Sequence, residues 1–334
     1  MTALLSLPVL IGLIAVALAF DLLNGLHDTA NSIATIVSTR MLRPRYAVVW
    51  AAFFNFIAFL LFGVHVARTV GVGIVAADVI DARVIFGALM GGISWNLITW
   101  WAGIPSSSSH ALIGGLVGAG VTKAGLASIV WPGLLTTGVF IVLSPMLGFF
   151  LALFLVLAVS WAFVRANPRA VEGTFKWLQF AAASAISLGH GGNDAQKTMG
   201  IIAVLLFSQG LLGADFYVPF WVVITCQAAM GLGTLIGGWR IVNTVGSKIT
   251  RMTPVQGCCA SAGGAIMLFA ATYLGIPVST THTVTGSIIG VGAARKASAV
   301  RWNIATNIVI AWIVTIPASA LMAVLFYILS GLFS

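Results

Sequence analysis

The chain has 334 residues, of which 60% are hydrophobic and 7% are charged, whereas a soluble domain carries about 25% charged residues. Apolar runs of about 20 residues, the length that crosses a bilayer, recur from end to end and leave no stretch polar enough for a soluble domain. The formal net charge of +9 therefore indicates basic loops on the cytoplasmic side of a membrane and not a nucleic-acid-binding surface.

The first half of the chain predicts five apolar helical segments. The first runs from about residue 4 to 24, is interrupted between Asn24 and Asp28, and resumes as far as Thr39. Basic residues and Pro44 follow it, a pattern typical of the end of a helix. The remaining segments cover about 46–66, 84–102, 109–121 and 131–162.

The second half of the chain repeats this order of segments. They cover about 174–206, with a break at 189–194, then 216–238, 254–274, 279–293 and 302–333. The third and fourth segments of each half either cross the membrane fully or form a re-entrant hairpin. Because two crossings or none return the chain to the same side, the sequence leaves both arrangements open.

Four pairs of matching stretches indicate that the two halves arose by duplication. They occur in the same order, at nearly constant offsets of 166 to 175 residues, and Asp28 aligns with Asp194. The pairs are 24–31 with 189–197, 68–71 with 243–246, 103–110 with 275–282, and Pro145 with Pro317. We therefore predict an all-α polytopic membrane protein made of two repeats, residues 1–165 and 170–334, with broken helices and short Ser/Thr-capped helices at the membrane midplane.

The odd number of segments in each repeat predicts that the repeats are inverted relative to one another. With the N-terminus outside, most basic residues fall in cytoplasmic loops, as the positive-inside rule requires. These residues are Arg40, Arg43, Arg45, Arg165, Arg169, Lys176, Arg240, Lys248, Arg251, Arg295, Lys296 and Arg301, against Arg68, Arg83 and Lys123 outside. We therefore predict a multi-pass protein of the inner (plasma) membrane with both termini outside.

Runs of Ser and Thr that follow Pro105 and Pro277 predict the starts of two short helices. A helix N-terminus offers free N–H groups and the positive end of the helix dipole to an anion, and hydroxyls add donors. Two such starts, facing each other across an inverted repeat, could hold one tetrahedral oxyanion near the midplane. The alternative is that these hydroxyls bond back to their own helices or join neighbouring ones. The substrate-binding candidates are Ser107, Ser108, Ser109, Ser279, Thr280 and Thr281, together with Asp28 and Asp194.

The two predicted breaks carry Asp28 and Asp194, and an ionisable residue at membrane depth indicates a functional site. Unwound backbone with carboxylate and amide oxygens suits a coupling cation, either Na⁺ or a proton. A carboxylate beside the anion would also make anion and cation bind together. The alternative is a structural ion pair, for example Asp194 with Lys197. The coupling-ion candidates are Asn24, His27, Asp28, Asn31, His190, Asn193, Asp194, Gln196 and Lys197.

The histidines fall into two groups. His27 and His190 are equally suited to a proton relay or to a structural role, whereas His110 and His282 favour a structural role. The three cysteines fit no zinc spacing, and the sequence predicts neither a metal centre nor a cofactor.

At these motifs the chain resembles the PiT family of inorganic phosphate transporters. That family carries a Gly-Ala-Asn-Asp-Val-Ala-Asn type signature and a Pro-Val-Ser-Thr-Thr-His type motif, each once per half. The matching stretches are 25–31, 191–197, 105–110 and 277–282, and the resemblance covers essentially the whole chain. It is closest to the bacterial low-affinity branch, which implies a homodimer that takes up phosphate, often as a neutral metal–phosphate complex, together with protons.

Two positions depart from the family signature. His27 replaces its first Asn in the first half, and Lys197 replaces its last Asn in the second. The resemblance implies that Na⁺-coupled members use these polar oxygens for the cation. We therefore hypothesise that the Lys197 ammonium stands in for a bound cation and that H⁺ is the driving ion.

Three other functions are weighed against alternating-access uptake of phosphate. A sulfate permease remains open, because a shorter branch of the family carries sulfate and this chain lacks a large central loop. Phosphate near pH 7 can donate a hydrogen bond to a carboxylate and sulfate cannot, which favours phosphate. An anion channel would tolerate neutralisation of Asp28. An enzyme would need a nucleophile with a positioned base, and Ser109 and His110 are sequence neighbours that do not face each other on a helix, so we predict no enzyme.

Overall fold

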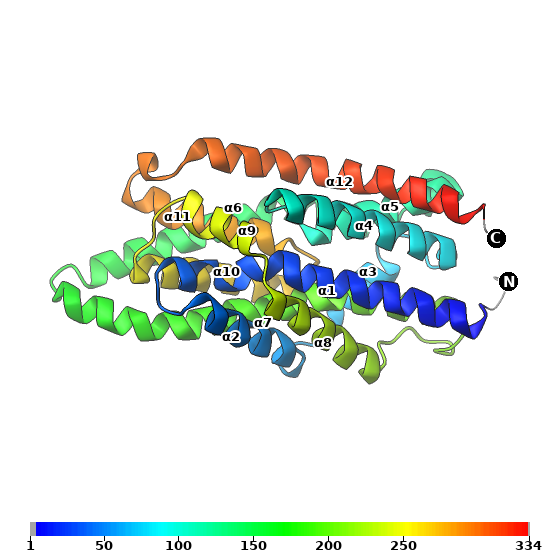
Figure 1. Cartoon of the computed structure of the whole chain (residues 1–334), viewed down its shortest axis with the longest axis horizontal. Helices are drawn as coiled ribbons and strands as arrows, with labels where there is room; N and C mark the ends of the chain where they lie inside the picture. The colour runs from blue at the N-terminus through cyan, green and yellow to red at the C-terminus, as the bar shows by residue number, and fades with distance from the viewer. Residues whose placement is uncertain (1–4, 333–334) are drawn as a thin grey trace.

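The computed structural model describes residues 5–332, which fold into α-helices joined by short connections (Figure 1). In chain order the α-helices are α1 (Leu7–Ser38), α2 (Pro44–Ile57), α3 (His65–Val72), α4 (Ala82–Ala102), α5 (Ser108–Ala124), α6 (Trp131–Ala162), α7 (Pro168–Ser208), α8 (Phe220–Ile236), α9 (Trp239–Asn243), α10 (Pro254–Tyr273), α11 (Thr280–Arg295) and α12 (Trp302–Ser330). This architecture confirms the predicted all-α polytopic class.

The described residues contain six helices that are long and apolar enough to cross a membrane, or eight spans if each bent helix pair is counted as one. In α6 and in α12, only 22% of the most apolar 18-residue stretch is buried inside the protein. Their exposed side chains include Leu135, Phe154, Leu321 and Leu325. Such helices suit direct contact with lipid, because their outer surface is apolar and a helix bonds most of its backbone groups internally, although each contains one proline, Pro145 or Pro317.

Two spans are broken, but not where the sequence predicted. Helix α2 leads through a 3₁₀ turn (Ala58–Leu60) into α3 with a bend of 83°, and α8 leads into α9 and a π-helical turn (Thr244–Lys248) with a bend of 65°. The sequence predicted each of these as a straight segment, at 46–66 and 216–238. The two bends are at equivalent places, because each lies in the second span of its half, between α2 and α3 in the first half and between α8 and α9 in the second.

The breaks predicted around Asn24–Asp28 and at residues 189–194 are wrong, because α1 and α7 run through them as continuous helices. The glycines at these points allow close helix contact. A Cβ on Gly25 would lie 2.1 Å from the carbonyl oxygen of Met230 in α8, and a Cβ on Gly191 would lie 2.4 Å from that of Asn55 in α2. No unwound carbonyls are therefore offered to a cation here.

Two helical hairpins, α4–α5 and α10–α11, enter the molecule from opposite ends and meet in its middle (Figure 1). Each first helix ends at a glycine with positive φ, Gly103 at 68° and Gly275 at 69°, a conformation that favours glycine. The hairpin tips, residues 103–109 and 275–281, then touch, since the Ser109 hydroxyl donates to the Val278 carbonyl at 3.2 Å. Contact between the two tips in the middle of the molecule favours the re-entrant arrangement of the two that the sequence left open, although α4, α5 and α10 are also long and apolar enough to cross a membrane.

A polar layer separates two apolar cores at the depth of the hairpin tips. Along α1, residues up to Phe20 pack into one core and residues from Ala30 onward into the other. Along α7, which crosses α1, Ile186 belongs to the second core and Met199 to the first. The polar residues between these points are buried, so the fold gathers them into one layer near the centre of the molecule.

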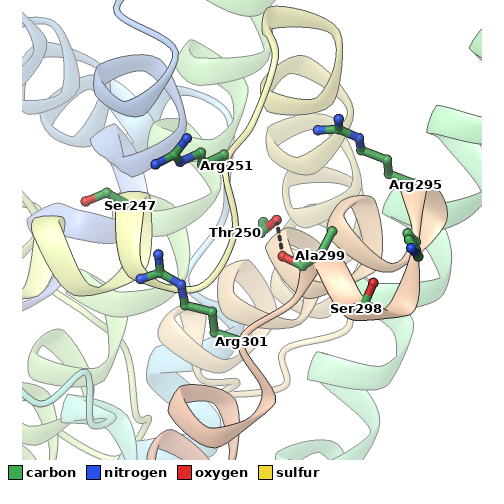
Figure 2. A pocket seen from close by; sticks show the side chains of 8 residues that line it. Ser247, Thr250, Arg251, Arg295, Ser298, Ala299 and Arg301 are labelled. Carbon is green, nitrogen blue, oxygen red and sulfur yellow. Dashed lines mark hydrogen bonds between the residues drawn. The ribbon is translucent and has the colours of Figure 1, made fainter.

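The first residues of α1 and the last residues of α12 lie at the same end of the molecule (Figure 1). The opposite end carries the basic connections between helices. Figure 2 shows a pocket between these connections, lined by Arg251, Arg295 and Arg301. Beside it the Thr250 hydroxyl donates a hydrogen bond to the Ala299 carbonyl at 3.1 Å. These arginines are exposed and lie away from the hairpin tips.

Candidate substrate and coupling-ion site

The two repeated aspartates come together at the crossing of α1 and α7. Ligand atoms of Asp28, His190 and Asp194 all lie within 4.8 Å of one another, and the three side chains are buried. Ser32, one turn after Asp28, lies with its hydroxyl 3.2 Å from His190 Nδ1 and joins the two helices there. The sequence repeat therefore corresponds to one shared cluster and not to two separate sites.

Both hairpins point helix N-termini at this cluster. Helix α5 is capped by Ser107 and α11 by Ser279, each accepting a hydrogen bond at 3.2 Å from the N–H three residues on, of His110 and His282. The capping hydroxyls thus satisfy one N–H each, and the earlier N–H groups of both helices have no partner within the helix. The two positive helix ends therefore face one region.

Asp28 holds both hairpins at once. Its oxygens accept hydrogen bonds from Ser108 Oγ of α5 at 2.7 Å and from Thr281 Oγ1 of α11 at 3.2 Å. His27 Nδ1 lies 2.7 Å from Asp28 Oδ1 and completes its surroundings. Hydroxyls from both halves of the chain therefore converge on a single carboxylate, so the two hydroxyl runs meet at one place, where they join neighbouring helices.

Asp194 and Lys197 form a buried ion pair on one face of α7. Asp194 Oδ2 also accepts a hydrogen bond from Thr280 Oγ1 at 2.8 Å, and His190 Nε2 lies 3.2 Å from the same oxygen. The Lys197 ammonium donates further to Ser109 Oγ and, at 2.8 Å, to the Val278 carbonyl. It therefore bonds to the tips of both hairpins as well as to Asp194.

The residue before each aspartate anchors the hairpin of its own half. His27 Nε2 lies 3.1 Å from Thr99 Oγ1 and 3.3 Å from Ser106 Oγ, both in the α4–α5 hairpin. In the second half, Asn193 bonds to residues 272, 276 and 278 of the α10–α11 hairpin at 3.0, 3.2 and 3.3 Å. His27, where the family signature has Asn, thus still contacts the hairpin of its own half, but through an imidazole ring and not through an amide.

The residue three positions after each aspartate instead reaches the hairpin of the other half. Asn31 donates to Thr280 Oγ1 and Thr281 Oγ1, both at 3.0 Å. Its counterpart, Lys197, donates to Ser109 of α5. Each hairpin tip is therefore bonded from both halves, which links the positions of the two hairpins.

Two further candidates lie at the edges of the cluster. Gln196 faces α3, where its carbonyl oxygen accepts the Val66 N–H at 2.9 Å and the Ala67 N–H at 3.3 Å. It therefore caps the start of α3, and its hydrogen bonds among the described residues go to the backbone and not to the aspartates. The side-chain oxygen of Asn24 is buried without a hydrogen-bond partner among the described residues.

His110 and His282 lie side by side behind the hairpin tips, with ring centroids 4.3 Å apart. His282 also stacks on Trp312 at 3.7 Å. Their ring nitrogens have no hydrogen-bond partner among the described residues. These contacts are those of packing residues, in line with the structural role that the sequence favoured.

The charges of the cluster set a condition on anion binding. If Asp28 and Asp194 are ionised, Lys197 is protonated and the histidines are neutral, two negative charges face one positive charge and the cluster has a net charge of −1. An added anion is repelled at this low-dielectric depth unless a proton or a cation arrives with it. Asp28, His190 and Asp194 are also close enough together to ligate such a cation, and oxygen and imidazole ligands suit several divalent metals.

Sequence reasoning missed Asp21. This aspartate lies on α1, one and two turns before Asn24 and Asp28, and is completely buried. The available signal was a single acidic residue inside the apolar run from residue 7 to 26. It was overlooked because it stands outside the repeated motif.

Comparisons with known proteins agree on one family. A family model described as the phosphate transporter family matches residues 24–323. A probable low-affinity inorganic phosphate transporter of Rhizobium meliloti (strain 1021) is 70% identical over 332 residues, which are 99% of each chain. A protein of the same description from Bacillus subtilis (strain 168) is 44% identical over 336 residues, covering 100% of both chains.

One solved structure has the same arrangement of helices. It is described as the sodium-dependent phosphate transporter and matches with a TM-score of 0.91 at 26% sequence identity. The match covers 98% of this chain and 100% of that one. The likeness therefore extends over the whole fold, both hairpins included.

Proposed function

This chain belongs to the phosphate transporter family, and from that premise we propose that it takes up inorganic phosphate by symport with H⁺ through alternating access. Membership in the family confirms the predicted resemblance, and it confirms that the chain is a transporter and not an enzyme. The substrate, the coupling ion and the residues that bind them are the proposal.

The observation that carries the proposal is the convergence of two helix N-termini on one buried cluster. The starts of α5 and α11 supply hydroxyls and backbone N–H groups, which are the donors that a tetrahedral oxyanion needs. Lys197 adds a positive charge between the tips. We assign phosphate binding to Ser107, Ser108, Ser109, Ser279, Thr280 and Thr281, with Asp28 and Asp194 as acceptors for its protons.

Those two acceptors are the reason to prefer phosphate over sulfate. Near pH 7 phosphate carries at least one proton and donates a hydrogen bond to a carboxylate, whereas sulfate has no proton to donate. Asp28 and Asp194 lie at the hairpin tips, where they already bond to hydroxyls of α5 and α11. A sulfate ion would place its negative oxygens beside these negative carboxylates with no proton to form a hydrogen bond between them. That repulsion is unfavourable in the buried interior.

The net charge of the cluster is the reason to expect a coupling cation. We propose H⁺ because Lys197 places a covalently attached ammonium where its counterpart Asn31 has an amide whose oxygen is buried without a hydrogen-bond partner among the described residues. The similar solved structure is described as sodium-dependent. A divalent metal that arrives with phosphate as a neutral complex would meet the same charge condition, with Asp28, His190 and Asp194 as ligands.

The direct test is uptake of ³²P-phosphate into proteoliposomes that contain the purified protein. The vesicles are made alkaline inside and free of sodium, and excess sulfate is added as a competitor. Uptake that follows the pH gradient and ignores sulfate supports the proposal. Uptake that needs a sodium gradient contradicts H⁺ coupling, and uptake that sulfate abolishes moves the assignment to a sulfate carrier on the same fold.

We also propose how the chain sits in the membrane. Residues 1–165 and 170–334 act as two inverted repeats, each with one hairpin, so that the hairpins open to opposite sides in turn. Both termini face outward, and the basic end with the pocket of Figure 2 faces the cytoplasm. We expect a homodimer, for which chemical cross-linking in native membranes would give a band of twice the mass of one chain.

A further inference from the structure

Among the described residues, one buried carboxylate outside the repeated motif makes no hydrogen bond. Asp21 on α1 has no exposed surface, and neither of its side-chain oxygens has a hydrogen-bond partner among the described residues. An unpaired, ionised carboxylate in a dry interior is strongly unfavourable, so such a group is neutralised by a proton or a cation. The surroundings of Asp21 show which of the two fits.

The polar atoms near Asp21 are themselves unsatisfied. Asn24 and Thr198 are its polar neighbours, and Asn24 Oδ1 and Thr198 Oγ1 are both buried without partners among the described residues. The charged and titratable groups that act on it are Lys197 and Asp194 on α7 and the thiol of Cys226 on α8. A carboxylic acid O–H on Asp21 would give either unsatisfied oxygen the donor that it lacks.

The two central aspartates are in a different situation. Asp28 accepts hydrogen bonds from two hydroxyls beside His27, and Asp194 is paired with Lys197 and bonded to Thr280. Their oxygens therefore have donors while they are ionised. The Asp21 oxygens make no hydrogen bond within the usual distance among the described residues, which separates Asp21 from the groups assigned to phosphate.

We propose that Asp21 is the residue that binds and releases the coupling proton; this inference rests on the proposed H⁺–phosphate symport. Asp21, Asn24 and Asp28 follow each other at i, i+3 and i+7 and so share one face of α1. When Asp21 is ionised, the layer carries a net charge of −2 with neutral histidines, and protonation of Asp21 lowers this to −1. Binding of the proton therefore favours entry of the phosphate anion.

The proton step is balanced and needs no other reactant. An O–H bond forms on an Asp21 oxygen when a proton arrives from water on the outer side, and the same bond breaks when the proton leaves to the cytoplasm after phosphate. Sodium fits this position less well. Asp21, Asn24 and Thr198 offer four side-chain oxygens, and the charge of the Lys197 ammonium acts on the Asp21 carboxylate, whereas a hard cation takes about six oxygen ligands.

The test compares two substitutions at Asp21 with a matched surface control. Asp21→Asn mimics the protonated side chain permanently, Asp21→Glu keeps a titratable carboxyl, and Asp215→Asn makes the same chemical change on an exposed residue. Purified variants in sodium-free proteoliposomes are assayed for ³²P-phosphate accumulation under a one-unit pH gradient. A trapped pH dye counts the protons that enter with each phosphate, and phosphate–phosphate exchange is measured at equal pH.

Each cotransported proton adds about a factor of ten to the accumulation ratio at a one-unit pH gradient. We expect Asp21→Asn to lower that ratio about tenfold and to remove one proton per phosphate while exchange continues. Asp21→Glu and Asp215→Asn should keep the full response. If wild-type uptake ignores the pH gradient, the proposed H⁺ symport fails. If wild-type responds and Asp21→Asn responds equally, or if Asp21→Asn also loses exchange, the assignment of the proton to Asp21 is overturned.

Discussion

Replacing Lys197 by Met would test whether the buried ammonium holds the site together. The ammonium bonds to Asp194, to Ser109 and to the Val278 carbonyl, and its side chain is 2% exposed. Met keeps an unbranched apolar chain but leaves Asp194 as a buried charge without its counter-ion. Loss of one partner of a buried ion pair destabilises a protein by about 3–5 kcal/mol. We expect that loss in the free energy of unfolding of Lys197→Met.

The assay is reversible unfolding in mixed micelles, followed by tryptophan fluorescence. Lys176→Met is the matched control, because Lys176 lies on the same helix and its ammonium is 3.9 Å from Glu172 on the exposed surface. An exposed pair of this kind contributes about 0.5 kcal/mol. The double variant Lys197→Met with Asp194→Asn should lose less stability than the two single variants added together, because no unpaired charge remains. A Lys197→Met loss no larger than that of the control would refute the reasoning.

Three further predictions concern coupling, packing and orientation. Asp28→Asn should abolish accumulation of phosphate against a gradient in proteoliposomes, whereas fast, unsaturable downhill flux in this variant would indicate a channel. Gly25→Ala should destabilise the fold by about 1–3 kcal/mol because its Cβ would meet a backbone carbonyl of α8, while Gly12→Ala, with open space around it, should be neutral or slightly stabilising in the same unfolding assay. Ser298→Cys should react with an impermeant maleimide in inside-out vesicles and not in whole cells, and the reverse pattern would contradict the proposed orientation.

Hydrophobic patterning predicted most of the fold. The long segment at 131–162 coincides with α6, and the segments at 254–274 and 279–293 lie within a residue or two of α10 and α11. Helix α6 is strongly apolar, and α10 and α11 begin at the capping residues Thr253 and Ser279, so local sequence decides these bounds. The matching Pro-Ser/Thr motifs also predicted the two capped helix starts correctly.

The breaks were mispredicted because glycine permits two different structures. At Gly25 and Gly191 the sequence suggested unwinding, but the missing side chains instead admit a neighbouring backbone, and both helices continue. The real bends after Ile57 and Ile236 follow apolar stretches without a proline. Tertiary contacts decide between these outcomes, and a single sequence does not contain them.

The sequence predicted which residues form the candidate site, but it did not predict the hydrogen bonds that join the two halves there. The repeated motifs identified Asp28, Asp194 and both hydroxyl runs, because chemistry and repetition coincided there. The exchange of contacts between halves, in which Asn31 and Lys197 each reach the opposite hairpin, depends on how two distant helices cross. Asp21 was missed because it occurs in one half only and so carries no repeat signal.

The central claim is that one hairpin tip from each half binds a single phosphate, and equilibrium binding tests it most directly. Binding of ³²P-phosphate to the purified protein is measured for wild type, Ser108→Ala in α5 and Thr281→Ala in α11. We predict one phosphate per chain, and an affinity about 10-fold or more weaker in either variant, because each removes a hydroxyl that we assign as a hydrogen-bond donor to the phosphate anion. Two phosphates per chain, or wild-type affinity in either variant, would contradict the claim.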